Sequence, residues 1–176
     1  MALYHFSVRH VSRGKGQMVV ASAAYISGQR IFDSYYNKIH DYTSKSGVVF
    51  TEILTPEYVP ERLTDRETLW NEVEHVERNN KAQLAYSFDI ALQNELTLEE
   101  NIRLAKEFCQ EQFVARGMIV DLAVHEGKSD NEEEPDNPHF HVLVPIRPFT
   151  EEGIWGNKQR LSLIHISEPT RPEPIS

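Results

Sequence analysis

HFHVLVPI, residues 139–146, places an apolar side chain at every second position, which is the pattern of a strand with one buried face. The even-numbered residues from Phe140 to Ile146 are all apolar. His139 and His141 stand on the other face, because side chains two apart in a strand point the same way. The stretch therefore predicts a sheet that carries two imidazoles on one side.

The segment upstream, MIVDLAVH at residues 118–125, alternates in the same way and ends in His125, on the face of Asp121. An acidic, polar connection at 126–138 links the two segments, so an antiparallel hairpin is the simplest topology. Pairing of the two strands would bring His125 to His139 and His141.

Three histidines around an open position suit a catalytic metal site, because water or substrate must reach the ion. Imidazole binds Zn, Mn, Ni, Co or Fe, and a phosphodiester substrate favours Mg or Mn. The alternative is a set of unrelated histidines on a half-buried strand. The shared face of His125, His139 and His141 strengthens the metal interpretation to about equal weight with the alternative.

The remaining pattern predicts an α+β fold, with a central antiparallel β-sheet and flanking helices. Strands are expected at 3–8, 48–54 and 85–92, helices at 18–26, 64–78 and 98–116, and a loop at 11–17. Thr64 with Glu67, and Thr97 with Glu100, have the spacing of capping boxes. Leu98 is expected to begin the buried stripe of the last helix.

Length and composition fit one globular domain: the chain has 176 residues, of which 40% are hydrophobic. Its single cysteine excludes an internal disulfide. No apolar run reaches the roughly 20 residues of a membrane helix, and the N-terminus lacks the pattern of a signal peptide. A cytoplasmic protein is expected.

The net charge of −9 argues against nucleic acid as a partner, but its distribution is uneven. Residues 1–50 carry six Lys or Arg and two Asp, whereas residues 51–138 carry eight basic and 21 acidic side chains. Phosphate affinity depends on local cations, so the first third can line a DNA-binding groove; a solvated surface of mixed charge is the alternative. The candidate DNA contacts are the basic and aromatic residues Arg9, Arg13, Lys15, Arg30, Tyr35, Tyr36 and Lys38.

Tyr25 lies among small residues in the segment AAYISG, which would let a DNA backbone approach a short helix. A tyrosine hydroxyl can attack a phosphodiester when a metal polarises the phosphoryl oxygen. A helical tyrosine more often packs in a core. Tyr35, Tyr36 and Tyr42 compete for the role, or stack on bases instead.

Taken together, the segments resemble the MobA/MobL relaxase family over roughly residues 1–160. The matching pieces are 1–13, 21–30, 41–42, 45–56, 65–85, 89–96, 113–127 and 137–148. The resemblance implies an HUH-type fold and strand-specific nicking of plasmid DNA at an origin of transfer. Tyr25 matches the nucleophile, which would hold the 5′ phosphate covalently. His125, His139 and His141 match the ligands of a divalent metal, Mn or Mg, and accessory mobilisation proteins and a coupling protein are possible partners.

Two departures from the family stand out. The connection at 126–138 is longer and more acidic than expected, although a hairpin tip tolerates insertion. The family often has Arg-Glu where this chain has Tyr86-Ser87. The role of that acid is then vacant or passes to Asp89, two residues on and on the same face. Asp121 is another candidate, for orienting a ligand histidine.

Residues 161–176 are expected to lie outside the domain at 1–160. LSLIHISEPTR, at 161–171, is what a common transposase-type sequencing adapter translates to, so a non-native tail on a truncated gene is expected. The alternative is a genuine, disordered Pro-rich tail.

Two other functions compete with a relaxase. A replication initiator or transposase would use the same HUH chemistry, but initiators usually place the tyrosine after the HxH pair, whereas here Tyr25 precedes His139. A DNA-binding remnant without nicking activity is the non-enzymatic alternative.

Overall fold

The computed structural model describes residues 6–159. The start of the first predicted strand and the proposed tail at 161–176 therefore lie outside the described residues. Five antiparallel strands form the central sheet in the order β1-β5-β7-β6-β4. They are β1 (Phe6–Ser12), β5 (Gln83–Ala91), β7 (His139–Pro145), β6 (Val120–His125) and β4 (Val48–Leu54). The expected α+β class is confirmed.

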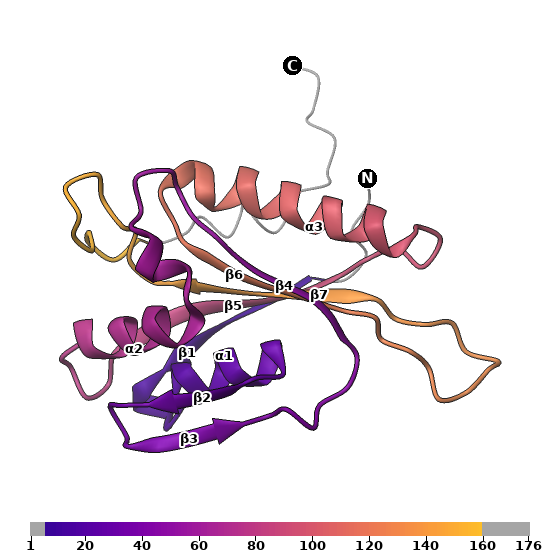
Figure 1. The fold of residues 1–176 in the computed structure, drawn as a ribbon, viewed down its shortest axis with the longest axis horizontal. Helices are drawn as coiled ribbons and strands as arrows, with labels where there is room; N and C mark the ends of the chain where they lie inside the picture. Colours follow the sequence, from indigo (N-terminus) through magenta and orange to yellow (C-terminus); the bar gives the residue numbers. More distant parts are fainter. Residues whose placement is uncertain (1–5, 160–176) are drawn as a thin grey trace.

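The sheet separates two layers (Figure 1). Helix α3 (Leu98–Gln112) covers one face, while α1 (Val19–Ser27), α2 (Arg66–Val76) and a small sheet cover the other. That small sheet pairs β2 (Arg30–Asp33) with β3 (Lys38–Asp41). Short 3-10 turns stand at Arg13–Lys15, Glu61–Thr64 and Val114–Arg116.

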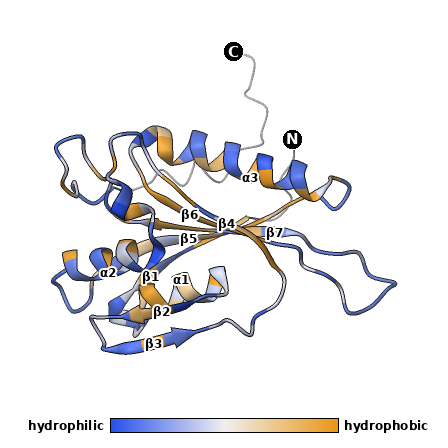
Figure 2. Cartoon of the chain, viewed as in Figure 1, coloured by the Kyte–Doolittle hydropathy of each residue, from blue (hydrophilic) through white to orange (hydrophobic). Residues whose placement is uncertain are grey.

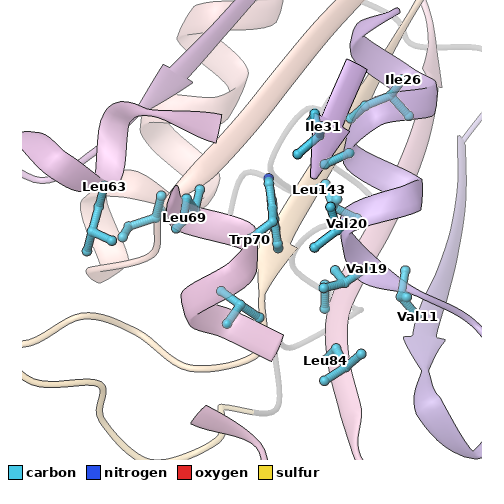
Figure 3. Close-up of a cluster of buried hydrophobic side chains, with 14 of the residues drawn as sticks. Val11, Val19, Val20, Ile26, Ile31, Leu63, Leu69, Trp70, Leu84 and Leu143 are labelled. Carbon is cyan, nitrogen blue, oxygen red and sulfur yellow. The ribbon is translucent and has the colours of Figure 1, made fainter. Parts of the chain in front are cut away.

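Alternation along the strands divides the core between the two layers. Leu122 and Val142 belong to the apolar cluster under α3, whereas Ala123 and Leu143 belong to the cluster formed with α1 and α2. The hydropathy colouring shows orange segments in the strands of the central sheet and mostly blue connections, while β3 of the small sheet is blue (Figure 2). Side chains from α1, α2 and the sheet meet around the fully buried Trp70 (Figure 3).

Several boundaries differ from the sequence-based expectations. β1 continues to Ser12 and then enters the 3-10 turn, because it pairs with β5 along its length. The hairpin of β2 and β3 was not predicted. Its alternation is short, and Asp33 closes the turn by accepting bonds from the backbone N–H groups of Tyr35 and Tyr36.

Helix caps were predicted correctly in one case and wrongly in another. Thr97 caps α3, with its hydroxyl 3.1 Å from the backbone nitrogen of Glu100, as expected. The expected cap of α2, Thr64, is wrong: Asp65 caps this helix, and its carboxylate accepts from Thr68 N at 3.0 Å. Leu98 is exposed, and Asn101 occupies the buried position in the first turn of α3.

Candidate metal centre and nucleophile

His125, His139 and His141 lie together on the face of the sheet that α1 covers. β6 pairs with β7 in the register that sets His125 opposite His139 and Ala123 opposite His141. One ligand atom from each ring lies within 4.8 Å of the other two. The ring centroids are 4.5 Å to 5.1 Å apart. The predicted convergence of the three histidines is thus present.

Backbone carbonyls fix the orientation of two of these rings. His125 Nε2 lies 2.8 Å from the carbonyl oxygen of Ile26, and His139 Nδ1 lies 2.8 Å from that of Asn137. A carbonyl only accepts, so each of these nitrogens must carry the proton. His125 Nδ1 and His139 Nε2 are left with lone pairs, which is the state that a metal ligand needs.

His141 is half-buried and lies beside a carboxylate. Its Nδ1 is 3.9 Å from Asp89 Oδ1, and the two residues are paired across β5 and β7. Burial lowers the pKa of His141 to about 4, although Asp89 works in the opposite direction. Burial also lowers the pKa of His125. Neutral imidazoles are the form that binds metal, so the residues present fit a divalent ion.

Tyr25 stands in the last turn of α1 with half of its surface exposed. The helix is short and Ala-rich, and Gly28 ends it in the left-handed conformation at φ 65°. The ring of Tyr42 meets that of Tyr25 edge-on, with centroids 5.3 Å apart. The phenol therefore does not pack in the core, which was the alternative for a helical tyrosine.

A groove of about 380 Å³ connects Tyr25 to the face of the sheet that carries the three histidines. One side comes from the outer strand β1, with Arg9 and His10, and another from α1, with Ser22 and Tyr25. His141 also lies in the lining. The arrangement can hold an extended phosphodiester between a nucleophile and a metal ligand.

The structure separates the predicted DNA contacts. Arg9 is exposed and lines the groove, and Lys15 is exposed in the turn after β1. Arg30 and Lys38 are exposed at opposite ends of the hairpin strands β2 and β3.

The two tyrosines of the hairpin turn lie beside α2. The ring centroid of Tyr35 is 5.7 Å from that of His75. Tyr36 stacks edge-on against Tyr35. Neither residue lines the groove that contains Tyr25.

Arg13 is buried, which corrects its prediction as a DNA contact. Its guanidinium donates to the carboxylate of Glu74 and to the backbone oxygens of Glu74, Glu77 and Asn79. The basic charge therefore serves to join the end of β1 to α2. Sequence alone does not distinguish it from the neighbouring Lys15, because both follow the strand in a polar turn.

Asp121 does not orient a histidine, which corrects a second expectation. Its buried carboxylate accepts from Arg66 Nε at 2.8 Å, from Arg66 Nη2 at 2.7 Å and from Trp70 Nε1 at 2.8 Å. The side chain shares a face with His125, as predicted, but it is occupied by α2. Asp121 thus attaches α2 to the sheet.

Lys45 is a residue near the site that the sequence-based reasoning missed. Its ammonium lies 3.5 Å from the ring centroid of Tyr25 and 3.1 Å from the Tyr25 carbonyl oxygen. Partial burial lowers its pKa. The only sequence signal was its position shortly after Tyr42, in a connection between strands.

Comparison with known proteins finds relatives over most of the chain. The model of the MobA/MobL family matches residues 17–172. The conjugal transfer protein TraA of Agrobacterium fabrum is 37% identical over 168 residues, which cover 90% of this chain and 15% of TraA. The mobilization protein MobL of Acidithiobacillus ferridurans is 32% identical over 94% of this chain and 44% of its own length. The chain thus spans less than half of either relative.

A solved structure has a closely similar fold. It comes from the work "Molecular Basis of Vancomycin Resistance Transfer in Staphylococcus aureus" and superposes with a TM-score of 0.79 at 37% identity. The similarity covers 92% of this chain and 79% of that one. Along residues 6–159, no helix combines the length and apolar character needed to cross a bilayer.

Proposed function

This chain belongs to the MobA/MobL family, and on that basis we propose that it nicks one DNA strand at a plasmid origin of transfer, with Tyr25 as the nucleophile. One observation carries the proposal: the exposed Tyr25 and the candidate metal ligand His141 line the same groove. A nucleophile and a metal ligand must share access to one phosphate for this chemistry. The substrate is single-stranded DNA exposed in a supercoiled plasmid.

The transfer step forms a bond between the scissile phosphorus and the phenolic oxygen of Tyr25, and it breaks the bond from phosphorus to the 3′ oxygen. The phenolic proton leaves to solvent at the open groove, and the 3′ oxygen takes up a proton. The products are a free 3′ hydroxyl and a 5′-phosphotyrosyl strand. Because no water is consumed, the reverse reaction can reseal the DNA.

His125, His139 and His141 would hold the divalent ion, with Mn or Mg as the expected metals. When bound, such an ion withdraws charge from a phosphoryl oxygen and makes the phosphorus easier to attack. Support comes from the carbonyls of Ile26 and Asn137, which leave one nitrogen free on each of two rings.

Asp89 takes the supporting acid role in this proposal. It lies across the strand pair from His141, with 3.9 Å between its carboxylate and the ring nitrogen. A carboxylate beside a metal-ligating imidazole favours the productive ring orientation and strengthens its donation. Ser87, also in the groove, has no charge to contribute.

The DNA strand would follow the groove along β1, where Arg9 is exposed beside His10. Arg13 is left out, because its charge is already paired with Glu74. Outside the groove, we propose further contacts to DNA of two kinds: exposed basic side chains bind phosphates, and the tyrosines of the β2–β3 turn stack on bases. They are Lys15, Arg30 and Lys38, and Tyr35 and Tyr36.

The decisive experiment looks for the covalent adduct. Single-stranded oligonucleotides tiling the DNA that flanks the gene, labelled at the 3′ end, are incubated with the protein and Mn²⁺ or Mg²⁺. Wild type is expected to form a labelled protein that survives denaturing electrophoresis. Tyr25→Phe removes the attacking oxygen and should abolish the adduct, while Tyr58→Phe, on an exposed tyrosine outside the groove, should leave it unchanged.

Other outcomes assign other functions. Retarded migration of an oligonucleotide with no adduct indicates a binding protein that does not cleave. An adduct that persists in Tyr25→Phe moves the nucleophile to Tyr35, Tyr36 or Tyr42.

A further inference from the structure

Lys45 makes two contacts with a single residue, Tyr25. Its ammonium lies 3.5 Å from the centroid of the phenol ring and donates to the Tyr25 carbonyl oxygen at 3.1 Å. A cation over an aromatic face is attracted by the ring, and this attraction grows when the cation is partly desolvated. Lys45 is partly buried.

Lys45 lies in the connection between β3 and β4, which passes the end of α1. Tyr42 N donates to Gln29 O at 3.0 Å, and Lys45 N donates to Tyr42 O at the same distance. These bonds join the connection to the end of α1, while the ring of Tyr42 lies edge-on to Tyr25. The phenol is therefore held by Tyr42 at one side and by the ammonium of Lys45 over its face.

The contact at the carbonyl matters because α1 ends there. The last carbonyls of a helix have no partner within it and carry partial negative charge, so a lysine at this end is stabilising. Ile26 O, the next carbonyl along, accepts from His125 Nε2. Neighbouring carbonyls of one helical turn are thus bound by Lys45 and by a candidate metal ligand.

We propose that Lys45 is a positioning residue that holds the Tyr25 phenol in its attacking orientation between the end of α1 and the groove. This inference rests on the proposed role of Tyr25. The ammonium makes both contacts, whereas an apolar side chain of similar length cannot donate to the carbonyl and lacks the positive charge that the ring face attracts. An arginine retains both capabilities, so it should substitute in part.

The test compares Lys45→Met with Lys45→Arg and with Lys81→Met, a control at an exposed lysine outside the groove. The probe is the 3′-labelled oligonucleotide that wild type cleaves, with Mn²⁺. We expect Lys45→Met to slow single-turnover adduct formation by about tenfold or more, because a misplaced nucleophile attacks less often. Its dissociation constant for the oligonucleotide should stay within about twofold of wild type. Lys45→Arg should regain most of the rate.

A second readout does not depend on cleavage. In the free protein, the ε protons of Lys45 should resonate upfield of the other lysines, because they lie over an aromatic ring, and Tyr25→Leu should remove that shift. Unshifted ε protons overturn the placement of Lys45. If wild type forms the adduct and Lys45→Met forms it at the same rate, the positioning role is overturned and the proposed function stands. The same conclusion follows if Lys45→Met is slow and Lys45→Arg does not restore the rate. If wild type forms no adduct, the result counts against the proposed function and also against the role of Lys45 in positioning Tyr25.

Discussion

The chemistry of the site depends on which nitrogen of each imidazole is free. His125 presents Nδ1 and His139 presents Nε2, because their other nitrogens donate to backbone carbonyls. Both carbonyls lie outside the two histidine strands, one at the end of α1 and one at the end of the acidic connection. The orientation of these two rings is therefore set by main-chain atoms, and it changes where a substitution moves the backbone.

A first prediction concerns Asp121, the acceptor for Arg66 and Trp70. Asp121→Ala leaves a buried guanidinium and an indole N–H without their partner, so we expect a loss of about 3–5 kcal/mol in the free energy of unfolding. Urea denaturation measures it. Asp130→Ala, at an exposed acid in the connection after β6, serves as the control and should change little. A loss in Asp121→Ala no greater than that of the control would contradict the anchoring role.

The residue-level predictions from sequence succeeded where strand periodicity decides the outcome. The alternation of side chains along a strand places His125, His139 and His141 on one face, and the three rings meet there. Arg13 and Asp121 were misassigned, because burial of a charge depends on partners far along the chain, Glu74 and Arg66. Such partners are fixed by tertiary packing and leave no local signal.

At the scale of elements, the two ends of the β6–β7 connection are joined at Gly127 and Asn137, and this contact holds His139 in place. Gly127 O accepts from Asn137 N at 2.8 Å, and Gly127 has a positive φ of 58°. A Cβ added at Gly127 would collide with the carbonyl oxygen of Asn137, which is the acceptor for His139. The glycine thus permits the close approach that orients a candidate metal ligand.

Gly127→Ala is accordingly expected to weaken Mn²⁺ binding by about tenfold or more, since it displaces an acceptor that orients a ligand. Gly153→Ala is a matched control: it also has a positive φ, of 84°, but a Cβ there meets nothing within 4 Å. Both variants should lose about 1–2 kcal/mol of stability from the positive φ. Gly127→Ala should lose more than Gly153→Ala, because its Cβ meets the backbone of Asn137. Calorimetric titration with Mn²⁺ separates them, and equal affinities in the two variants would refute the proposed effect on His139.

Among the elements, sequence predicted those with long periodic patterns and missed those formed by few residues. Strand β4 was expected at 48–54 and is found there. The β2–β3 hairpin has four residues in each strand, too few for a pattern to stand out, and its turn depends on Asp33 accepting from two backbone amides. The cap of α2 was misplaced by one residue because Thr64 and Asp65 are both good capping residues, and the geometry of the preceding 3-10 turn decides between them.

Over the whole molecule, the negative charge is concentrated away from the first third of the chain. Part of it lies in the exposed acids Glu132, Glu133 and Glu134 of the β6–β7 connection, between the strands that carry the histidines. Another part lies on α3, which covers the opposite face of the sheet (Figure 1). The first group follows the strands that carry the histidines, whereas the second lies across the sheet, so we expect a bound DNA strand to pass nearer the first group. Screening limits the reach of each charge to about 10 Å at 0.1 M salt.

Replacing Glu132, Glu133 and Glu134 by Gln should therefore tighten the binding of a single-stranded oligonucleotide by a few-fold at low salt, with the difference shrinking as NaCl is raised. The control variant replaces three exposed acids of α3, Glu99, Glu107 and Glu111, and changes the net charge equally. Fluorescence anisotropy gives both affinities. Equal tightening in the two triple variants would show that total charge, and not its location, governs binding.

The hydrogen bond from His125 to Ile26 O has one more consequence. It joins the candidate metal centre to the helix that carries Tyr25, so we expect metal binding at the one to be coupled to order at the other. Linkage is reciprocal: if metal favours the ordered helix end, then fixing that end must favour metal by the same factor. If Tyr25 becomes tethered to a DNA strand as proposed, we expect the three histidines to bind a metal more tightly than before. The tethered intermediate would then retain the ion that it needs to reseal the strand.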